Sequence, residues 1–285
     1  MSVRVLVVGI GSGDPGHLTV EAVAALNAVD VFLVADKRAA TRDLVTLRAE
    51  LCAAVITHDR YRFVEVADPE RGPDAGRDST AYAEAVRDWH AERARRHAEA
   101  ITREVGGSGT VGLLVWGDPS LYDSTLRVVD TIGELWGSGS RSVGDGNPPG
   151  GAGGRPPSGL GVPLEVTVVP GISSVSLLAA RHRIALNRVG RPVHITTGRR
   201  LVEEYDEALG DVVVMLDGDL ACAGLVEAHP DLEIFWGAQL GLPDEALVHG
   251  RLTDVLPELR TRRDAVRAAR GWVMDTYLLR PGTGP

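Results

Sequence analysis

The N-terminal segment joins a run of β-branched residues to a glycine-rich turn and then to a helix signal. Val3 to Val8 is almost continuously apolar, which is typical of a strand buried on both faces of a mainly parallel sheet. Thr19 is placed to cap a helix from Val20 to Asn27, with Glu21 in its first turn, and Val31 to Ala35 repeats the strand pattern. This order predicts a β-α-β unit, which constrains the chain to an α/β fold.

The same alternation continues along the chain. Five more strands are predicted, at Val111 to Trp116, Leu164 to Val169, Val193 to Thr197, Val212 to Leu216 and Leu232 to Trp236. The clearest helix is Ser79 to Val105, which is rich in Ala, Glu and Arg. The basic run from Arg260 to Arg270 is typical of a solvated helix face.

Residues 137–161 interrupt this order, because Gly, Pro and Ser dominate and almost no residue can be buried. Such a composition does not offset its ordering entropy, so we expect a flexible surface insertion. The strand expected after it can complete the same sheet. We therefore place the domain boundary in the polar turn at 187–191, which gives domains 1–188 and 189–285.

The composition of the chain limits the kinds of partner that it can bind. The net charge of the 285 residues is −9, which argues against nucleic acid as a general partner. No apolar run reaches the roughly 18 residues of a membrane span, and the N-terminus does not resemble a signal peptide. Cys52 and Cys222 are far apart, and His90 and His97 lack metal-ligand spacing. We expect a soluble cytoplasmic protein without a metal.

The loop that begins at Gly9 invites comparison with a dinucleotide-binding turn. That fingerprint needs a third glycine where this chain has Asp14, and a carboxylate there repels a pyrophosphate. Pro15 also removes a backbone donor where donors are wanted. The loop is better suited to a cationic or zwitterionic ligand.

Two further turns follow predicted strands. Residues 115–122 contain a Gly-Asp-Pro turn, in which Gly117 allows close backbone approach. Residues 169–174 contain Pro-Gly followed by two serines, of which Ser173 or Ser174 could cap a helix or face a ligand. Neither serine has the surroundings of a hydrolase nucleophile.

Taken in this order, the three turns resemble the tetrapyrrole (corrin/porphyrin) methylase family. Its pattern runs V-G-x-G-P-G-D-P-x-x-L-T, then G-D-P, then P-G-x-[ST]-[SA], and this chain matches it at 9–19, 117–119 and 170–174. The chain departs from the pattern at Ser12, where the family usually has Pro, and this puts the contact of that residue in doubt. The resemblance implies two α/β domains with S-adenosylmethionine in the cleft between them, usually in a homodimer.

Carried over by motif, the resemblance implies a set of cofactor-binding residues. These are Ser12, Trp116, Gly117, Asp118, Leu121, Ser173, Ser174, Met215 and Leu240. Met215 could equally be an ordinary core residue.

Residues 116–125, 180–188 and 195–201 resemble the family members that methylate precorrin-5 at C-1 and release its acetyl group as acetate. The hydrolytic half of that reaction benefits from a general base, for which Asp14, Asp118 and Tyr122 are candidates by position. A polycarboxylate substrate favours arginine donors. Candidates are Arg181, Arg183, Arg188, Arg199 and Arg200, although most arginines lie on solvated surface.

Three alternatives remain open at this point. One is another corrin-ring or uroporphyrinogen methylase that acts without deacetylation. A second is a nicotinamide-dependent oxidoreductase, against which Asp14 argues. The third is a tetrapyrrole carrier without catalytic activity, which would bind the macrocycle and not the methyl donor.

Overall fold

The computed structural model describes residues 2–36, 42–69, 79–136 and 162–282. The chain forms two compact units, the first of residues 1–11 and 15–171 and the second of residues 12–14 and 172–285. Helix α5 (Ser174–His182) belongs to the second unit, whereas these residues were expected in the first domain. The boundary at 188/189 concerns independently folding domains and stays a prediction. The expected insertion at 137–161 lies outside the described residues.

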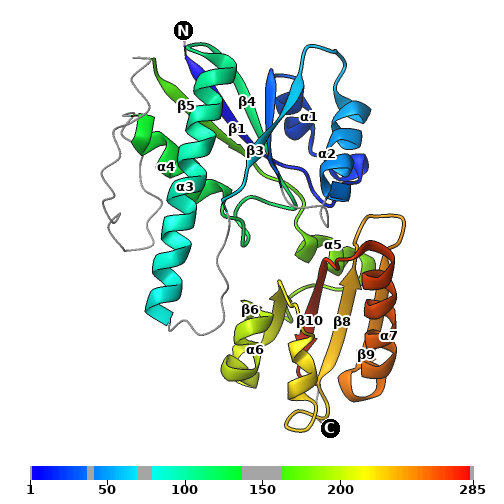
Figure 1. The fold of residues 1–285 in the computed structure, drawn as a ribbon. Coiled ribbons are helices and arrows are strands. Elements are labelled where there is room, and N and C mark those ends of the chain that lie inside the picture. The colour runs from blue at the N-terminus through cyan, green and yellow to red at the C-terminus, as the bar shows by residue number, and fades with distance from the viewer. Residues whose placement is uncertain (1, 37–41, 70–78, 137–161, 283–285) are drawn as a thin grey trace. The chain divides into compact units, whose positions relative to one another are not determined.

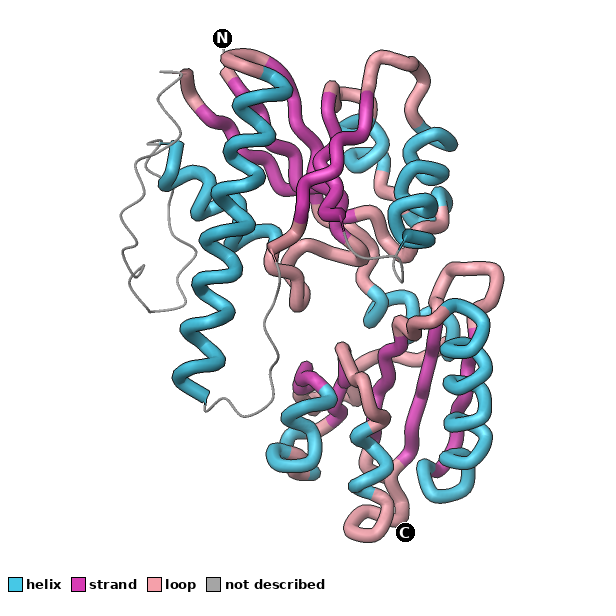
Figure 2. The backbone as a smooth tube through the Cα atoms, in the orientation of Figure 1, coloured by secondary structure: helices cyan, strands magenta, loops and turns pink. Residues whose placement is uncertain are grey.

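A sheet of five parallel strands forms the centre of the first unit (Figures 1 and 2). Its strands are β1 (Val3–Gly9), β2 (Val31–Asp36), β3 (Arg62–Ala67), β4 (Gly109–Val115) and β5 (Leu164–Val169). Their order is β3-β2-β4-β1-β5, so the strand after 137–161 completes the same sheet, as expected. Every residue of β1 except Arg4 is buried, which confirms a strand covered on both faces.

Helices cover both faces of this sheet. They are the 3-10 turn η1 (Pro15–His17) and the helices α1 (Val20–Leu26), α2 (Arg42–Val55), α3 (Ser79–Val105) and α4 (Thr125–Trp136). Val5 and Val7 pack with α3 and α4, whereas Leu6 and Val8 pack with α1 and α2. Thr19 caps α1 as predicted, because its hydroxyl accepts a hydrogen bond of 3.0 Å from the backbone N–H of Ala22.

The second unit contains a mixed sheet of five strands in the order β6-β7-β10-β8-β9. These strands are β6 (Val193–Thr197), β7 (Asp211–Met215), β8 (Glu233–Ala238), β9 (Ala246–Arg251) and β10 (Asp275–Arg280). The other elements are α6 (Gly198–Glu204), η3 (Glu207–Leu209), η4 (Ala221–Leu225) and α7 (Leu252–Arg270). β6 is parallel to β7, and β10 is antiparallel to both β7 and β8. The carboxyl ends of β6, β7 and β8 therefore lie at one edge.

The core of the second unit lies mainly on one face of this sheet. Trp236 and Tyr277 are completely buried there, with side chains from α6, α7 and η4. Helix α5 packs on the other face, where His182 Nε2 lies 3.0 Å from the carbonyl oxygen of Trp236. This packing explains why α5 belongs with the second unit.

The predicted strands are confirmed within two residues at each end. The predicted helix at 79–105 is also confirmed. Three strands were missed, namely β3, β9 and β10. The expectation that the face of 260–270 is solvated is wrong at Arg263, which is 5% exposed and whose Nε lies 2.8 Å from Asp275 Oδ2.

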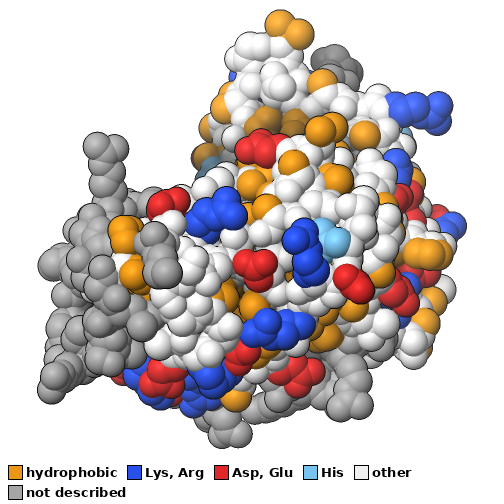
Figure 3. Space-filling view, turned by 90° about the horizontal axis from the view of Figure 1, so that it is seen from above, with side chains coloured by type: hydrophobic (Ala, Val, Ile, Leu, Met, Phe, Trp, Pro, Cys, Tyr) orange, Lys and Arg blue, Asp and Glu red, His pale blue; other side chains and the backbone are white. Residues whose placement is uncertain are grey.

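Acidic and basic side chains are interspersed on the face of the molecule drawn in Figure 3. That face therefore does not present the continuous basic surface on which nucleic-acid binding depends. None of the helices in the described ranges is both long enough and apolar enough to cross a membrane.

Candidate functional site

Three loops of the first unit meet at the carboxyl edge of its sheet. They follow β1, β4 and β5, which are neighbours in the sheet, and they are the three turns singled out in the sequence. Gly11 and Gly117 exchange backbone hydrogen bonds of 3.2 and 2.6 Å, and the N–H of Ile10 donates to the carbonyl of Val115 at 2.8 Å. The β1 and β4 loops are thus joined directly through their backbones.

Glycine is required where these loops cross. A Cβ on Gly9 would lie 2.6 Å from the nitrogen of Gly171, and a Cβ on Gly171 would lie 2.2 Å from the oxygen of Gly117. Both distances are shorter than real contacts, so the backbones could not approach with any side chain present. Gly11 and Gly117 also have left-handed φ values of 62° and 67°. The glycines of the three motifs therefore serve one tightly packed backbone junction.

Asp118 clamps this junction. Its Oδ2 accepts a hydrogen bond of 2.9 Å from the N–H of Gly171, and its Oδ1 accepts from the N–H of Ser120 at 2.8 Å and from the Ser120 hydroxyl. Burial acts to raise the pKa of Asp118, but these hydrogen bonds outweigh it and lower the pKa below its ordinary value. A carboxylate that is stabilised in this way is a weak general base.

Trp116 lies directly before the junction and contacts a basic side chain. The Arg48 guanidinium from α2 lies over the Trp116 ring, with its Cζ atom 5.1 Å from the ring centroid. The indole Nε1 of Trp116 is buried and has no hydrogen-bond partner in the structure. Burial lowers the pKa of Arg48 to about 10. Arg48 was not among the predicted site residues, because a single arginine inside an unremarkable helix gives no sequence signal.

The other two candidate bases differ in their surroundings. Tyr122 is 46% exposed and has a left-handed φ of 51°, a costly conformation for a residue with a bulky side chain. Leu121, a predicted cofactor contact, donates its N–H to the carbonyl of Asp118 at 3.2 Å and so closes the turn before Tyr122. Asp14 and Ser12 are half-buried in the segment 12–14.

The serines of the third motif begin α5. Ser173 is the N-cap, and its hydroxyl accepts a hydrogen bond of 3.2 Å from the N–H of Ser176. Ser174 is the first helical residue and is half-buried. Of the two serines predicted as possible helix caps, Ser173 is therefore the one that caps α5.

The remaining predicted cofactor contacts lie at the carboxyl edge of the second sheet. Met215 ends β7 and is half-buried, and Leu240 follows β8 and is 6% exposed. Between these strand ends, Leu216 and Gln239 both have left-handed φ values of 52°. The buried Nε2 of Gln239 has no hydrogen-bond partner in the structure. Leu216 and Gln239 were not predicted, since backbone strain at non-glycine residues leaves no mark in one sequence.

Four of the five predicted substrate arginines belong to local structure of the second unit. Arg181 lies 2.9 Å from Glu245, and Arg188 lies 3.1 Å from the fully buried Asp211. Arg200 pairs with Glu204 one turn along α6, and Arg183 is the left-handed C-cap of α5. Arg199 is exposed at the start of α6.

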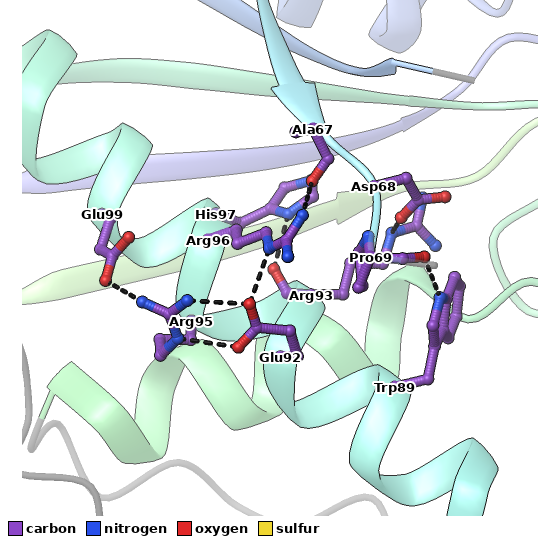
Figure 4. Close-up of polar contacts among 10 residues, drawn as sticks. All are labelled: Ala67, Asp68, Pro69, Trp89, Glu92, Arg93, Arg95, Arg96, His97 and Glu99. Carbon is purple, nitrogen blue, oxygen red and sulfur yellow. Dashed lines mark hydrogen bonds and ion pairs between the residues drawn. The ribbon is translucent and has the colours of Figure 1, made fainter. Parts of the chain in front are cut away.

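A second group of polar residues lies at the end of β3 in the first unit, where α3 passes (Figure 4). Arg93 Nε lies 3.1 Å from Asp68 Oδ1, and its guanidinium lies over the Trp89 ring at 4.9 Å. The Nη1 of Arg93 also donates to the hydroxyl of Ser124, just before α4, at 3.2 Å. His97 is buried beneath this group, with Nδ1 2.8 Å from the carbonyl oxygen of Arg93. Arg93 thus links α3 to the end of β3 and to the residue before α4, although its buried Nε and Asp68 Oδ1 form an ion pair without a hydrogen bond.

The residues named by motif suit S-adenosylmethionine better than a diphosphate. Backbone groups and apolar side chains dominate the sites named by motif, and the buried Nε2 of Gln239 can donate to an acceptor of the kind that a carboxylate or a ribose supplies. Within the described ranges, no group of three or more His, Cys, Asp and Glu side chains could hold a metal ion. The absence of a metal stays a prediction.

Comparison with known proteins places the chain in a family. The profile of the tetrapyrrole (corrin/porphyrin) methylases matches residues 4–137 and 160–256. Precorrin-6A synthase [deacetylating] from Sinorhizobium sp is 40% identical over 279 residues, which are 98% of this chain and 95% of the relative.

Solved structures agree with this result. A cobalamin synthesis related protein from Corynebacterium diphtheriae is 32% identical, with a TM-score of 0.75 and 99% of each chain covered. Uroporphyrin-III C-methyltransferase from Thermus thermophilus, solved with S-adenosylhomocysteine, is 20% identical, with a TM-score of 0.54 over 98% of this chain and 97% of that one, and shows the shared fold. With its three glycine turns at adjacent strand ends, the chain belongs to the tetrapyrrole (corrin/porphyrin) methylases.

Proposed function

We propose that this chain is an S-adenosylmethionine-dependent methyltransferase of corrin biosynthesis that methylates precorrin-5 at C-1 and releases acetate, to give precorrin-6A. The observation that carries this proposal is the 40% identity to a deacetylating precorrin-6A synthase over nearly the whole of both chains. Membership of the family supports the methyl donor.

The motifs assign the methyl donor to two groups of residues. The first group lies in the first unit and consists of Trp116, Gly117, Asp118 and Leu121. The second group lies in the second unit and consists of Ser12, Ser173, Ser174, Met215 and Leu240. When bound, the donor supplies a methyl group on an electrophilic sulfonium, which needs no activation by the protein.

The contribution of the chain to methyl transfer is positional. The backbone junction of Gly9, Gly117 and Gly171 holds the loops that carry the first group close together, because the backbones approach so closely that Gly9 and Gly171 have no room for a side chain. Holding two reactants in attack geometry lowers a barrier by about 7–11 kcal/mol. Asp118 serves this purpose through its hydrogen bonds, so we assign it a positioning role.

Release of acetate requires water to attack the acetyl carbonyl. The C–C bond to C-1 then breaks, its electron pair remains on the ring carbon, and that carbon attacks the methyl group. A general base that accepts a proton from this water would accelerate the attack. Asp14 and Tyr122 remain the candidates, because the hydrogen bonds of Asp118 reduce its basicity.

Incubation of the purified protein with precorrin-5 and S-adenosylmethionine tests the proposal. We expect acetate and methylated product in equal amounts, and S-adenosylhomocysteine binding by calorimetry. Methyl transfer without acetate would contradict the deacetylating assignment, and failure to bind S-adenosylhomocysteine would contradict the methyltransferase assignment. The variants Asp14→Asn and Tyr122→Phe then identify the base as the one whose loss suppresses acetate release while binding persists.

The state and location of the protein are part of the same proposal. We expect a cytoplasmic homodimer, as is usual in the family, with a small-molecule tetrapyrrole as the substrate and neither nucleic acid nor membrane as a partner. Light scattering after size-exclusion chromatography measures the mass directly, and a monomer at micromolar concentration would contradict the dimer.

A further inference from the structure

Arg48 is a cation in an unfavourable place. It lies within α2 on the face of the first sheet that also holds Trp116, and its Nη1 reaches back to the carbonyl oxygen of Leu44 at 3.4 Å. This bond holds the guanidinium against its own helix. Burial makes the position costly for a cation, since desolvation favours the neutral form.

No acidic side chain of the described residues lies within ion-pair distance of Arg48. The nearest charges that act on it are Asp123, which favours its cationic form, and Arg93, which opposes it. Asp123 is already engaged, because its Oδ1 accepts the N–H of Thr125 at the start of α4 at 2.6 Å. Arg93 has Asp68 as its own partner. Buried charges in proteins are normally paired, and none of the described residues supplies the opposite charge at Arg48.

The neighbouring Trp116 indicates the chemistry of the missing group. Its indole Nε1 is buried and unpartnered, and the guanidinium lies over the same ring. Both side chains carry N–H donors, and neither side chain contains an atom that accepts a hydrogen bond. The Arg48 guanidinium has further N–H groups besides the one that bonds Leu44, and these match a carboxylate.

We propose that Arg48 and the indole N–H of Trp116 together bind one carboxylate of the tetrapyrrole substrate. This inference rests on the proposed function for the identity of the substrate. Trp116 then contributes its side chain to the substrate, while its main chain belongs to the group assigned to the methyl donor. Three of the five arginines selected from the sequence, Arg181, Arg188 and Arg200, instead pair with carboxylates of the second unit.

Substitution at Arg48 tests the proposal against a matched control. We expect Arg48→Gln to raise KM for precorrin-5 about 10- to 100-fold, because a hydrogen-bonded charge is lost, with kcat changed much less. Arg48→Lys keeps the charge without the planar donor set, so its KM should lie between those of the unmodified protein and Arg48→Gln. Arg95→Gln is the control, because Arg95 is an exposed arginine of α3 that pairs with Glu92 and Glu99, and its KM should stay within about twofold.

Binding of S-adenosylhomocysteine separates this role from a structural one. We expect the Kd of every variant to match that of the unmodified protein, so that the change is confined to the tetrapyrrole. Trp116→Phe keeps the ring, removes the N–H and should raise KM about threefold to tenfold. An unchanged KM in a folded Arg48→Gln variant would overturn the proposal. If that variant does not fold, unchanged KM values in both Arg48→Lys and Trp116→Phe would overturn it instead.

The proposed function can fail independently of this inference. Its failure appears in the unmodified protein, as missing acetate or missing S-adenosylhomocysteine binding. The inference about Arg48 fails only in the comparison among variants. Binding of uroporphyrin I, a stable tetrapyrrole with eight carboxylates, provides the second readout, and we expect about tenfold weaker binding by Arg48→Gln than by Arg95→Gln.

Discussion

The carboxyl edge of each sheet is stabilised by a different kind of contact. In the first unit, three loops pack backbone against backbone, and the contacts of Gly9, Gly117 and Gly171 leave no space for a side chain. In the second unit, the corresponding edge is held by buried polar side chains. Asp217 accepts hydrogen bonds from Ala221 and from the Tyr277 hydroxyl, and Arg263 bonds the carbonyl oxygens of Asp217 and Gly218.

This difference predicts which substitutions each edge can accept without loss of stability. The first edge depends mainly on close backbone packing, so an added methyl group should disturb it more than a change of charge does. The second depends on satisfied charge, because Arg263 also pairs with Asp275, which in turn accepts the indole N–H of Trp236. Burial raises the pKa of Asp275, although Arg263 opposes that shift. Removal of one member leaves another buried without a partner.

The largest effect is expected at the second edge. Arg263→Leu leaves Asp275 buried without its cation, so we expect the free energy of unfolding to fall by about 3–5 kcal/mol. Urea denaturation measures it. Arg262→Leu is the matched control one residue away, since Arg262 forms an exposed pair with Glu258 and should cost under about 1 kcal/mol. Equal losses in both variants would mean that charge does not hold this edge.

The first edge should respond to volume. Gly171→Ala forces the backbones apart, so we expect a loss of about 2–4 kcal/mol together with weaker S-adenosylhomocysteine binding. Denaturation and calorimetry give the two values. Gly107→Ala is the control in the same unit, because its Cβ would meet only Val162 at 3.7 Å. A harmless Gly171→Ala would show that the junction can relax.

The carboxylate of Asp118 is a charged group that stabilises the first edge through hydrogen bonds. Asp118→Asn keeps the shape and weakens the hydrogen bonds to Gly171 and Ser120, so we expect a loss of about 1–2 kcal/mol near pH 7. The pKa of Asp118 is lowered in the folded chain, so its contribution is present above its unfolded pKa of about 4 and is lost as the pH falls through the folded pKa.

Stability measured from pH 7 to pH 3 should therefore converge for the unmodified protein and Asp118→Asn at the acidic end. Parallel curves would contradict this assignment and would indicate that the ionised carboxylate does not stabilise the fold.

The smallest effect is expected at the helix cap beside this edge. Ser173→Ala removes the hydrogen bond to Ser176 and should cost about 1 kcal/mol, as should Thr19→Ala at the start of α1. Because the Ser173 hydroxyl is committed to the cap, the Kd for S-adenosylhomocysteine should stay within about twofold. A larger change in Kd for Ser173→Ala than for Thr19→Ala would show that this hydroxyl also contacts the methyl donor.

The sequence predicted the parts of this molecule that depend on local pattern. β1 and β5 are apolar runs beside turn residues, and α3 is rich in helix formers, so each was placed from its own residues. β3, β9 and β10 were missed because each mixes polar and apolar residues, and β10 pairs with β7 and β8, which are distant in sequence. Resemblance, more than pattern, indicated the glycine turns as one site.

The residues that the sequence did not reveal are defined by what surrounds them. Arg48 resembles any helical arginine until its guanidinium is seen to lie over Trp116, with no acid of the described residues in ion-pair distance. Arg263 was misjudged for the same reason, since its burial depends on Asp275 from the next element. Partners of this kind are tertiary, and neither spacing nor composition records them.

The position of β10 bears on how the chain is made. The first sheet is complete once Val169 has been synthesised, whereas the second has β10 between β7 and β8 and lacks its central strand until Arg280 is added. Chains fold as they emerge during translation, with N-terminal parts first. The first unit can therefore assemble on the ribosome, while the strands of the second must wait with their edges unpaired. Ribosome-stalled chains that end before Asp275 should expose this half to proteolysis and to chaperones.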